Sequence, residues 1–182
     1  MLRRLRQPLY LWGLARKLNM GLGSTASLLK AYYFGRRPAL QKLVKDSVVV
    51  TLPEWGKLPL RVNGYDHKLM SQTFLRQDYK IEAKNVHRIL DLGANVGMAT
   101  LYLHRLFPDA KFECVEASPR NWGMLKRTVE LNQIPARIFE AAIGAEEGKI
   151  DLYLSANPDC NSVVPGQEPD TQVVSVPLIS VP

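Results

Sequence analysis

A chain of 182 residues with 46% hydrophobic content can form one globular domain with some appendage. The formal net charge of +7 comes from residues 1–46, which carry ten Lys or Arg and one acid, whereas residues 47–182 carry fourteen Lys or Arg and sixteen acids. No run of 18 or more apolar residues occurs, so the sequence contains no candidate transmembrane helix. The region after residue 46 lacks a basic stripe with interleaved aromatics, which argues against a nucleic-acid-binding domain.

Residues 1–46 are predicted to form a basic helical segment ahead of a second domain, residues 47–182. The amino terminus has the charge order of a signal peptide but no small-x-small cleavage site, so a short amphipathic helix is expected instead. Its apolar and basic residues are Leu9, Leu11, Trp12, Leu14, Arg3, Arg4, Arg6, Arg16 and Lys17. Such a helix suits a peripheral contact with an anionic membrane surface. A helix that docks on the domain, which is the favoured alternative, or a solvated basic tail would show the same pattern.

Further helices and a hairpin are expected before the centre of the chain. Ser24 can cap a helix of about ten residues, and Pro38 suits the first position of another. From residue 47 the pattern changes, because residues 47–52 and 59–63 have the composition of two strands joined by a turn. Asp66 can then cap a helix. We expect this hairpin and helix to cover one end of a site formed by the residues that follow.

The central segment has the alternating pattern of a βαβαβ unit. The predicted elements are a strand at 87–92, a helix at 96–107, a strand at 111–116, a helix at 119–132 and a strand at 137–143. Strands that alternate with helices of this length indicate a parallel sheet with right-handed crossovers. After residue 144 the alternation stops, and two further strands are expected in KIDLYLS and TQVVSVPLISV.

Acidic residues and glycines gather where the first two strands of this unit end. The first strand runs into Asp91 and a turn with Gly93, Asn95 and Gly97, and the second strand ends in Glu116. The glycines allow close approach of a ligand, and Asn tolerates a left-handed backbone. The spacing is G-x-x-x-G and not the dinucleotide G-x-G-x-x-G, and an acid just before it repels a pyrophosphate but suits a cation.

S-adenosylmethionine fits this pattern better than a dinucleotide, because it carries an ammonium group and a sulfonium but no phosphate. Glu116 could then accept hydrogen bonds from both ribose hydroxyls. The alternative is that Asp91 only caps its helix and that Glu116 is a solvated strand end. The two acids together, with a glycine turn in a strand-helix-strand context, favour the cofactor site.

The stretch ILDLGANVGMATLYLHRLFPDAKFECVEASPRNWGMLKRTVELN, followed by AAIGAEEGKIDLYLS, resembles the FkbM-type methyltransferases, and the resemblance covers about residues 62–182. It implies an α/β, Rossmann-like class I methyltransferase fold, with a first βαβαβ half and extra β-strands after N-terminal helices. The implied activity is O-methylation of a hydroxyl on a sugar, a glycolipid or a small natural product. By position, Asp91, Gly93 and Gly97 would surround the methionine part of S-adenosylmethionine, and Glu116 would hold the ribose. Ala142, or its neighbour at the end of the third strand, would approach the adenine.

Members of this family continue beyond the VPLISVP strand with an acidic helix and a strand carrying a K-x-D-x-E-G type motif. Against that pattern the chain is expected to be a partial or shortened enzyme that is inactive alone, with one side of its first strand unpaired and its pocket half built. The alternative is a non-catalytic half-domain that the basic N-terminus tethers to a membrane or a partner.

The sequence leaves the catalytic base unknown. Asp66, His67 and Tyr79 are the candidates near the mouth of the site; Asp66 is equally well explained as a helix cap and His67 as a solvated helix residue. His87 and His104 are expected to be structural.

Cys114 and Cys160 lack the spacing of metal ligands, so we expect no metal site. We interpret both as reduced thiols of a cytoplasmic protein.

Overall fold

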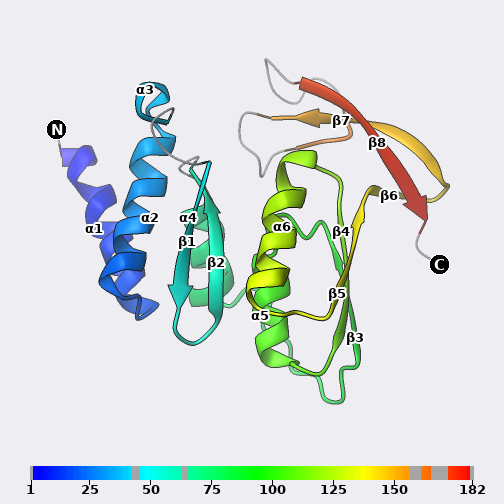
Figure 1. The fold of residues 1–182 in the computed structure, drawn as a ribbon, viewed down its shortest axis with the longest axis horizontal. Coiled ribbons are helices and arrows are strands. Elements are labelled where there is room, and N and C mark those ends of the chain that lie inside the picture. Colours follow the sequence, from blue (N-terminus) through cyan, green and yellow to red (C-terminus); the bar gives the residue numbers. More distant parts are fainter. Residues whose placement is uncertain (1, 42–45, 63–64, 156–160, 165–171, 181–182) are drawn as a thin grey trace.

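The computed structural model describes residues 2–41, 46–62, 65–155, 161–164 and 172–180. Its described strands form three sheets: the hairpin β1-β2, the parallel sheet β3-β4-β5 and the sheet β6-β8-β7. Figure 1 shows the hairpin between the N-terminal helices on one side and α6 on the other, with the parallel sheet on the far side of α5 and α6 from the hairpin. No helix in the described part of the chain is both long and apolar enough to cross a bilayer.

Helices α1 (Leu2–Lys17), α2 (Leu22–Gly35) and α3 (Pro38–Gln41) form the N-terminal layer. The structure favours the docked form of α1, because Leu11 and Leu14 are buried in the same hydrophobic core as the hairpin. Leu9 and Trp12 are exposed on the opposite side of the helix. The side chains of Arg3, Arg4 and Arg6 lie outside the described residues.

The predicted capping role of Ser24 is wrong. Helix α2 begins at Leu22 after the N-cap Gly21, and the Ser24 hydroxyl instead accepts a hydrogen bond from the Thr51 amide at 2.9 Å. Ser24 therefore joins α2 to the hairpin.

The predicted hairpin is confirmed, with strands β1 (Ser47–Leu52) and β2 (Gly56–Arg61) in antiparallel register. Its turn end is attached to α6 by Asn132, whose side chain accepts from the Lys57 amide at 2.8 Å and donates to the Lys57 carbonyl at 2.7 Å. Gly56 permits this close approach, because its φ is +130° and an added Cβ would lie 2.3 Å from the Asn132 oxygen. The following helix is α4 (Asp66–Met70), continued by a π-helical turn, Ser71–Leu75.

The predicted parallel unit is present as β3 (Arg88–Leu92), α5 (Met98–Leu106), β4 (Lys111–Glu116), α6 (Pro119–Leu131) and β5 (Ala136–Glu140). Both β3 and β5 pair in parallel with β4, and the two helices cover one face of the sheet (Figure 1). This is the strand arrangement of a Rossmann-like fold. Among the described strands β3 pairs with β4 alone, so β3 is an edge strand as expected, and Leu92 at its end is 52% exposed.

The prediction of one continuous third strand at 137–143 is wrong. The strand breaks at Ala141, whose amide donates to the Glu116 carbonyl, and the chain continues as β6 (Ala142–Gly144) in the other sheet. There β6 pairs in parallel with β8 (Gln172–Ser180), which pairs antiparallel with β7 (Gly148–Leu154). The two strands predicted after residue 144 are thus confirmed. The break turns β6 away from the parallel sheet, so the two sheets meet beside Glu116.

Candidate cofactor site

The glycine turn after β3 is folded back against the end of β4. The amides of Gly93 and Ala94 both donate to the Val115 carbonyl, at 2.8 and 3.0 Å. Gly93 and Gly97 have positive φ, and Asn95 takes the left-handed conformation that the sequence predicts, with φ +52°. At Gly97 an added Cβ would lie 3.0 Å from Leu125 on α6, so glycine is required there by packing as well as by backbone conformation.

Glu116 is 7% exposed and closes this turn. Its Oε2 accepts a hydrogen bond from the Asn95 amide at 2.8 Å, and its Oε1 accepts from the Ser118 amide at 2.8 Å and from Asn121 Nδ2 at 3.1 Å. The interpretation of Glu116 as a solvated strand end is therefore wrong. Since a carboxylate oxygen accepts about two hydrogen bonds, Oε1 is fully used and Oε2 has room for one more.

Asp91 lies on β3 and accepts a hydrogen bond from the Thr100 hydroxyl at 2.6 Å. Burial raises the pKa of Asp91, the Thr100 hydrogen bond lowers it, and the negative charge of Glu116 raises it further. The helix-cap interpretation of Asp91 is wrong, because the N-cap of α5 is Gly97 and receives no side-chain cap. A partly buried carboxylate within electrostatic reach of a second carboxylate is a favourable place for a cation.

Tyr79 lies within electrostatic reach of Asp91. Its pKa is raised, first by burial and then by the negative charges of Asp91 and Asp78. The phenol therefore keeps its proton at neutral pH, so it suits a hydrogen-bond donor better than a general base.

A pocket of about 240 Å³ opens beside Glu116. The sequence-predicted residues among its lining are Gly93, Asn95 and Glu116, and the others are Ala117, Ser118, Asn121, Leu152 and Asn161. None of these lining residues is Lys or Arg, so the described lining itself offers no positively charged side chain to a phosphate. The pocket suits a neutral or cationic ligand that offers hydroxyl donors.

Three of the sequence-predicted residues, Asp91, Gly97 and Ala142, do not line this pocket. Ala142 lies in β6 of the second sheet, where it is buried with Leu152 and Val176. The wall next to Glu116 comes instead from Leu152 and Asn161, which follow the break in the third strand. Sequence reasoning missed Asn121; a polar residue in the first turn of the helix after Glu116 was the available signal.

Asp66 and His67, two of the candidates near the mouth, do not line this pocket. Asp66 forms a buried ion pair with Arg61 at 2.6 Å, and the N-cap of α4 is Tyr65, so Asp66 is not a helix cap. His67 is 6% exposed, with the rings of Tyr10 and Tyr32 nearby, so the expectation of a solvated histidine is wrong.

The remaining histidines and cysteines show no reactive arrangement in the described residues. His87 is exposed, and burial lowers the pKa of His104. Cys114 is a buried free cysteine whose pKa is raised to about 11 by burial, so its thiol stays protonated. Cys160 lies outside the described residues. Over the described ranges, no group of three His, Cys, Asp or Glu side chains could hold a metal ion.

The parallel sheet, the glycine turn after its first strand and the carboxylate that ends its second strand have the arrangement of a Rossmann-like fold, in which ligands bind at the carboxyl ends of the strands. No protein-family model matches the chain. The chain is 27% identical over 89 residues to "Methyltransferase 1" of Beauveria bassiana, covering 48% of this chain and 36% of that protein. It is 29% identical over 82 residues to "Methyltransferase sdnD" of Sordaria araneosa, covering 44% of this chain and 32% of that protein.

The chain thus spans about a third of the length of the curated relatives it matches. A solved structure of a SAM-dependent methyltransferase from Agrobacterium tumefaciens matches with a TM-score of 0.39 and 18% identity, over 53% of this chain and 33% of that chain. Over about half of its length, the chain is thus similar to proteins named methyltransferase.

Proposed function

We propose that the full-length protein is an S-adenosylmethionine-dependent O-methyltransferase of FkbM type. Its acceptor is a hydroxyl of a sugar, a glycolipid or a small natural product. The observation that carries the proposal is the buried Glu116 carboxylate, which holds the Asn95 amide and borders a pocket without Lys or Arg in its lining. The two partial sequence matches to methyltransferases support the same chemistry.

The described residues fit S-adenosylmethionine by their chemistry. Oε2 of Glu116 retains room for one ribose hydroxyl, and Leu152 offers an apolar wall. Asp91 lies outside the pocket lining, on β3 within electrostatic reach of Glu116, and offers a charge to the ammonium or sulfonium group. When bound, the cofactor supplies an electrophilic methyl group. The protein's residues contribute by aligning the acceptor hydroxyl with this methyl group and by excluding water. Tyr79 can orient the acceptor as a donor, and the residue that removes the acceptor's proton stays unassigned.

Calorimetry on the full-length gene product tests this function. We expect S-adenosylmethionine and S-adenosylhomocysteine to bind with micromolar to submillimolar dissociation constants, and NAD to bind far more weakly, because the described pocket has no cation for a pyrophosphate. A folded protein that binds NAD more tightly than S-adenosylmethionine would contradict the proposal. Transfer of a labelled methyl group to a panel of sugars, glycolipids and phenols then identifies the acceptor class.

We also propose that α1 contacts an anionic membrane surface, whether the protein is an active enzyme or a non-catalytic tethered half-domain. The supporting observation is the free side of α1, where Leu9 is 69% and Trp12 is 54% exposed. The Arg16 guanidinium lies 5.8 Å from the Trp12 ring centroid, which places a positive charge beside the apolar pair. Exposed aromatic and aliphatic side chains next to basic residues suit the headgroup region of a bilayer.

Flotation with vesicles tests this contact. We expect the protein to float with vesicles of phosphatidylserine and phosphatidylcholine and to stay at the bottom with phosphatidylcholine alone. The Leu9→Ser/Trp12→Ser variant should lose most of the bound fraction. The control is Ile81→Ser, which removes an apolar side chain that is 52% exposed elsewhere on the chain. Equal flotation of the two variants would rule out α1 as the contact.

A further inference from the structure

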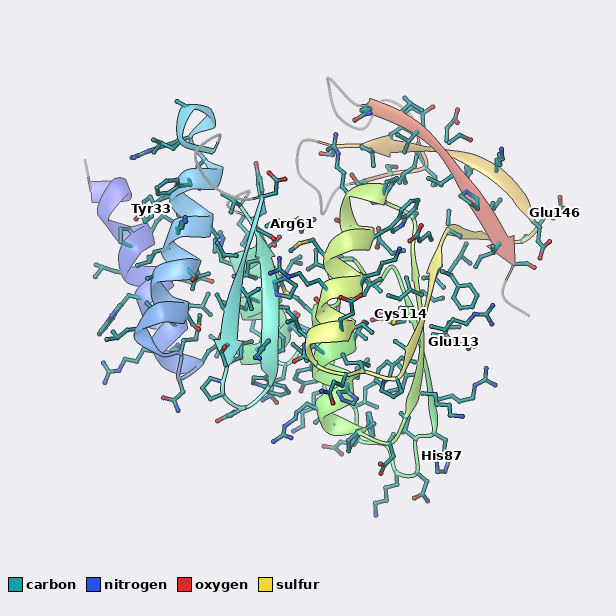
Figure 2. All side chains as sticks on the ribbon, in the orientation of Figure 1. Tyr33, Arg61, His87, Glu113, Cys114 and Glu146 are labelled. Atoms are coloured by element: carbon teal, nitrogen blue, oxygen red, sulfur yellow. The ribbon has the colours of Figure 1, made fainter. Side chains whose placement is uncertain are left out.

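A line of buried polar side chains connects the hairpin to Glu116. Arg61, the last residue of β2, donates from its NH1 to Asn121 Oδ1 on α6 at 2.8 Å. Asn121 Nδ2 donates in turn to Glu116 Oε1 at 3.1 Å. Arg61, Asn121 and Glu116 are 8%, 2% and 7% exposed, so these bonds lie away from competing water. Figure 2 shows Arg61 near the upper end of the hairpin.

Asp66 fixes Arg61 at the start of this line. The Asp66 carboxylate accepts from the Arg61 backbone amide at 2.7 Å, from its Nε at 2.9 Å and from its NH2 at 2.6 Å. Two side-chain bonds on one guanidinium hold its plane, and NH1 is left directed at Asn121. The pair is neutral overall, so the effect of Arg61 on the pocket is geometric and not a net charge.

The donation from Arg61 decides which way the Asn121 amide points. An amide has one acceptor oxygen and one donor nitrogen, so an oxygen held by Arg61 leaves the nitrogen facing Glu116. The opposite orientation would bring the amide oxygen against the carboxylate and the amide NH₂ group against the guanidinium, which are both repulsive contacts. Arg61 therefore sets the polarity of Asn121, and Asn121 holds Oε1 of Glu116.

Holding Oε1 also determines where Oε2 lies. With Oε1 fixed by Asn121 and by the Ser118 amide, the carboxylate cannot rotate, and Oε2 stays on the Asn95 amide at the pocket. We propose that Asn121 and Arg61 are positioning residues for the cofactor's ribose, acting through Glu116, and that the hairpin is thereby a functional part of the cofactor site. This inference rests on the proposed function, because it assumes that Oε2 of Glu116 binds a ribose hydroxyl.

The test compares two Asn→Ala variants on α6 and its C-cap in the full-length protein. Asn121→Ala breaks the line to Glu116, whereas Asn132→Ala removes two hydrogen bonds between α6 and the same hairpin at its far end. The probes are S-adenosylhomocysteine and its 2′,3′-dideoxy analogue, which lacks both ribose hydroxyls. The readout is the ratio of their two dissociation constants, which a general loss of stability does not change.

We expect the wild-type protein to prefer S-adenosylhomocysteine over the dideoxy analogue by about tenfold or more, the size expected for a hydrogen bond to a charged group. Asn121→Ala should reduce this preference to about threefold or less, and Asn132→Ala should keep it. A wild-type preference in Asn121→Ala would overturn the positioning role alone. A wild-type protein that binds neither probe would overturn the proposed function together with it.

A second variant covers the case in which Asn121→Ala does not fold. Asn121→Asp keeps the size of the side chain and its contact with Arg61, but it presents a negative charge to Glu116. The preference for the ribose hydroxyls should fall at neutral pH and recover as the pH is lowered and the carboxylate pair takes up a proton. A preference that stays at the wild-type value at every pH would also overturn the proposal.

Discussion

Replacing Glu116 by alanine should lower the affinity of the full-length protein for S-adenosylmethionine by about a hundredfold and the free energy of unfolding by about 2 to 4 kcal/mol. Both effects have one cause. The carboxylate accepts from the Asn95 amide, the Ser118 amide and Asn121, so its removal leaves three donors without their acceptor and releases the turn that borders the pocket. Calorimetry gives the affinity, and urea unfolding gives the stability.

The matched control is Glu113→Ala on the same strand. Glu113 pairs with Arg88 at 3.0 Å in a solvent-exposed ion pair, and Figure 2 shows it on the side of the sheet away from α6. Its loss should cost less than about 1 kcal/mol and leave cofactor binding unchanged. Glu116→Gln keeps the shape of the side chain but sets an amide NH₂ group against one of the three donors, so it should fold and bind at least tenfold more weakly. Wild-type affinity in Glu116→Gln would refute the role of Glu116 in cofactor binding.

The Asp91→Asn substitution should weaken cofactor binding without lowering the stability of the fold. We expect the affinity for S-adenosylmethionine to fall by about tenfold or more, because a cationic ligand loses its nearby charge. The unliganded variant should be at least as stable as the wild type at pH 7, since burial raises the pKa of Asp91 and so makes its charged form costly. The Thr100 hydroxyl can still donate to the amide oxygen of asparagine.

The raised pKa of Asp91 determines how the free energy of unfolding depends on pH. With a native pKa above the ordinary value of 3.8, the native state holds the Asp91 proton more tightly than the unfolded state. Stability is therefore lost as the pH rises from about 4 through the raised native pKa. The difference in unfolding free energy between Asp91→Asn and wild type should grow across this window and stay constant above it. Cofactor affinity in the wild type should rise over the same window.

Thermal and urea unfolding at a series of pH values measure the first effect, and calorimetry measures the second. Asp109→Asn, an exposed carboxylate between α5 and β4, is the control and should change neither. A strongly destabilised Asp91→Asn variant at neutral pH, or one with wild-type cofactor affinity, would contradict the assignment of Asp91 to a cation.

The parallel unit was predictable because its signals are local. The alternation of apolar strands with helices fixes β3, α5, β4 and α6 to within a few residues, and the glycines with Asn95 specify the left-handed turn between β3 and α5. The acids at the ends of β3 and β4 fall on the same edge of a parallel sheet by topology alone. The sequence also indicates what these two carboxylates can bind, because acids at a glycine turn repel a pyrophosphate and suit a cationic ligand.

The wrong predictions concern residues whose local sequence fits two structural roles. Ser24 and Asp66 could both cap a helix, but Ser24 accepts a hydrogen bond from the Thr51 amide and Asp66 accepts one from the Arg61 guanidinium. His67 is adjacent to a charged residue in sequence, yet aromatic rings from α1 and α2 surround it. The third strand ends its pairing with β4 at Glu140, and from Ala142 the chain pairs with β8 instead. The apolar run 137–143 does not reveal this change of partner.

The sequence by itself determined the Rossmann-like half and the position of the Glu116 carboxylate at the end of β4, because strand period, helix period and turn chemistry are properties of neighbouring residues. Only the tertiary structure decided how that carboxylate is held. The Arg61 to Asn121 hydrogen bond spans 60 residues of sequence, and the pocket wall at Leu152 comes from a different sheet. Such contacts depend on how the hairpin and the second sheet pack against α6, and packing across that distance leaves no periodic signal in the chain.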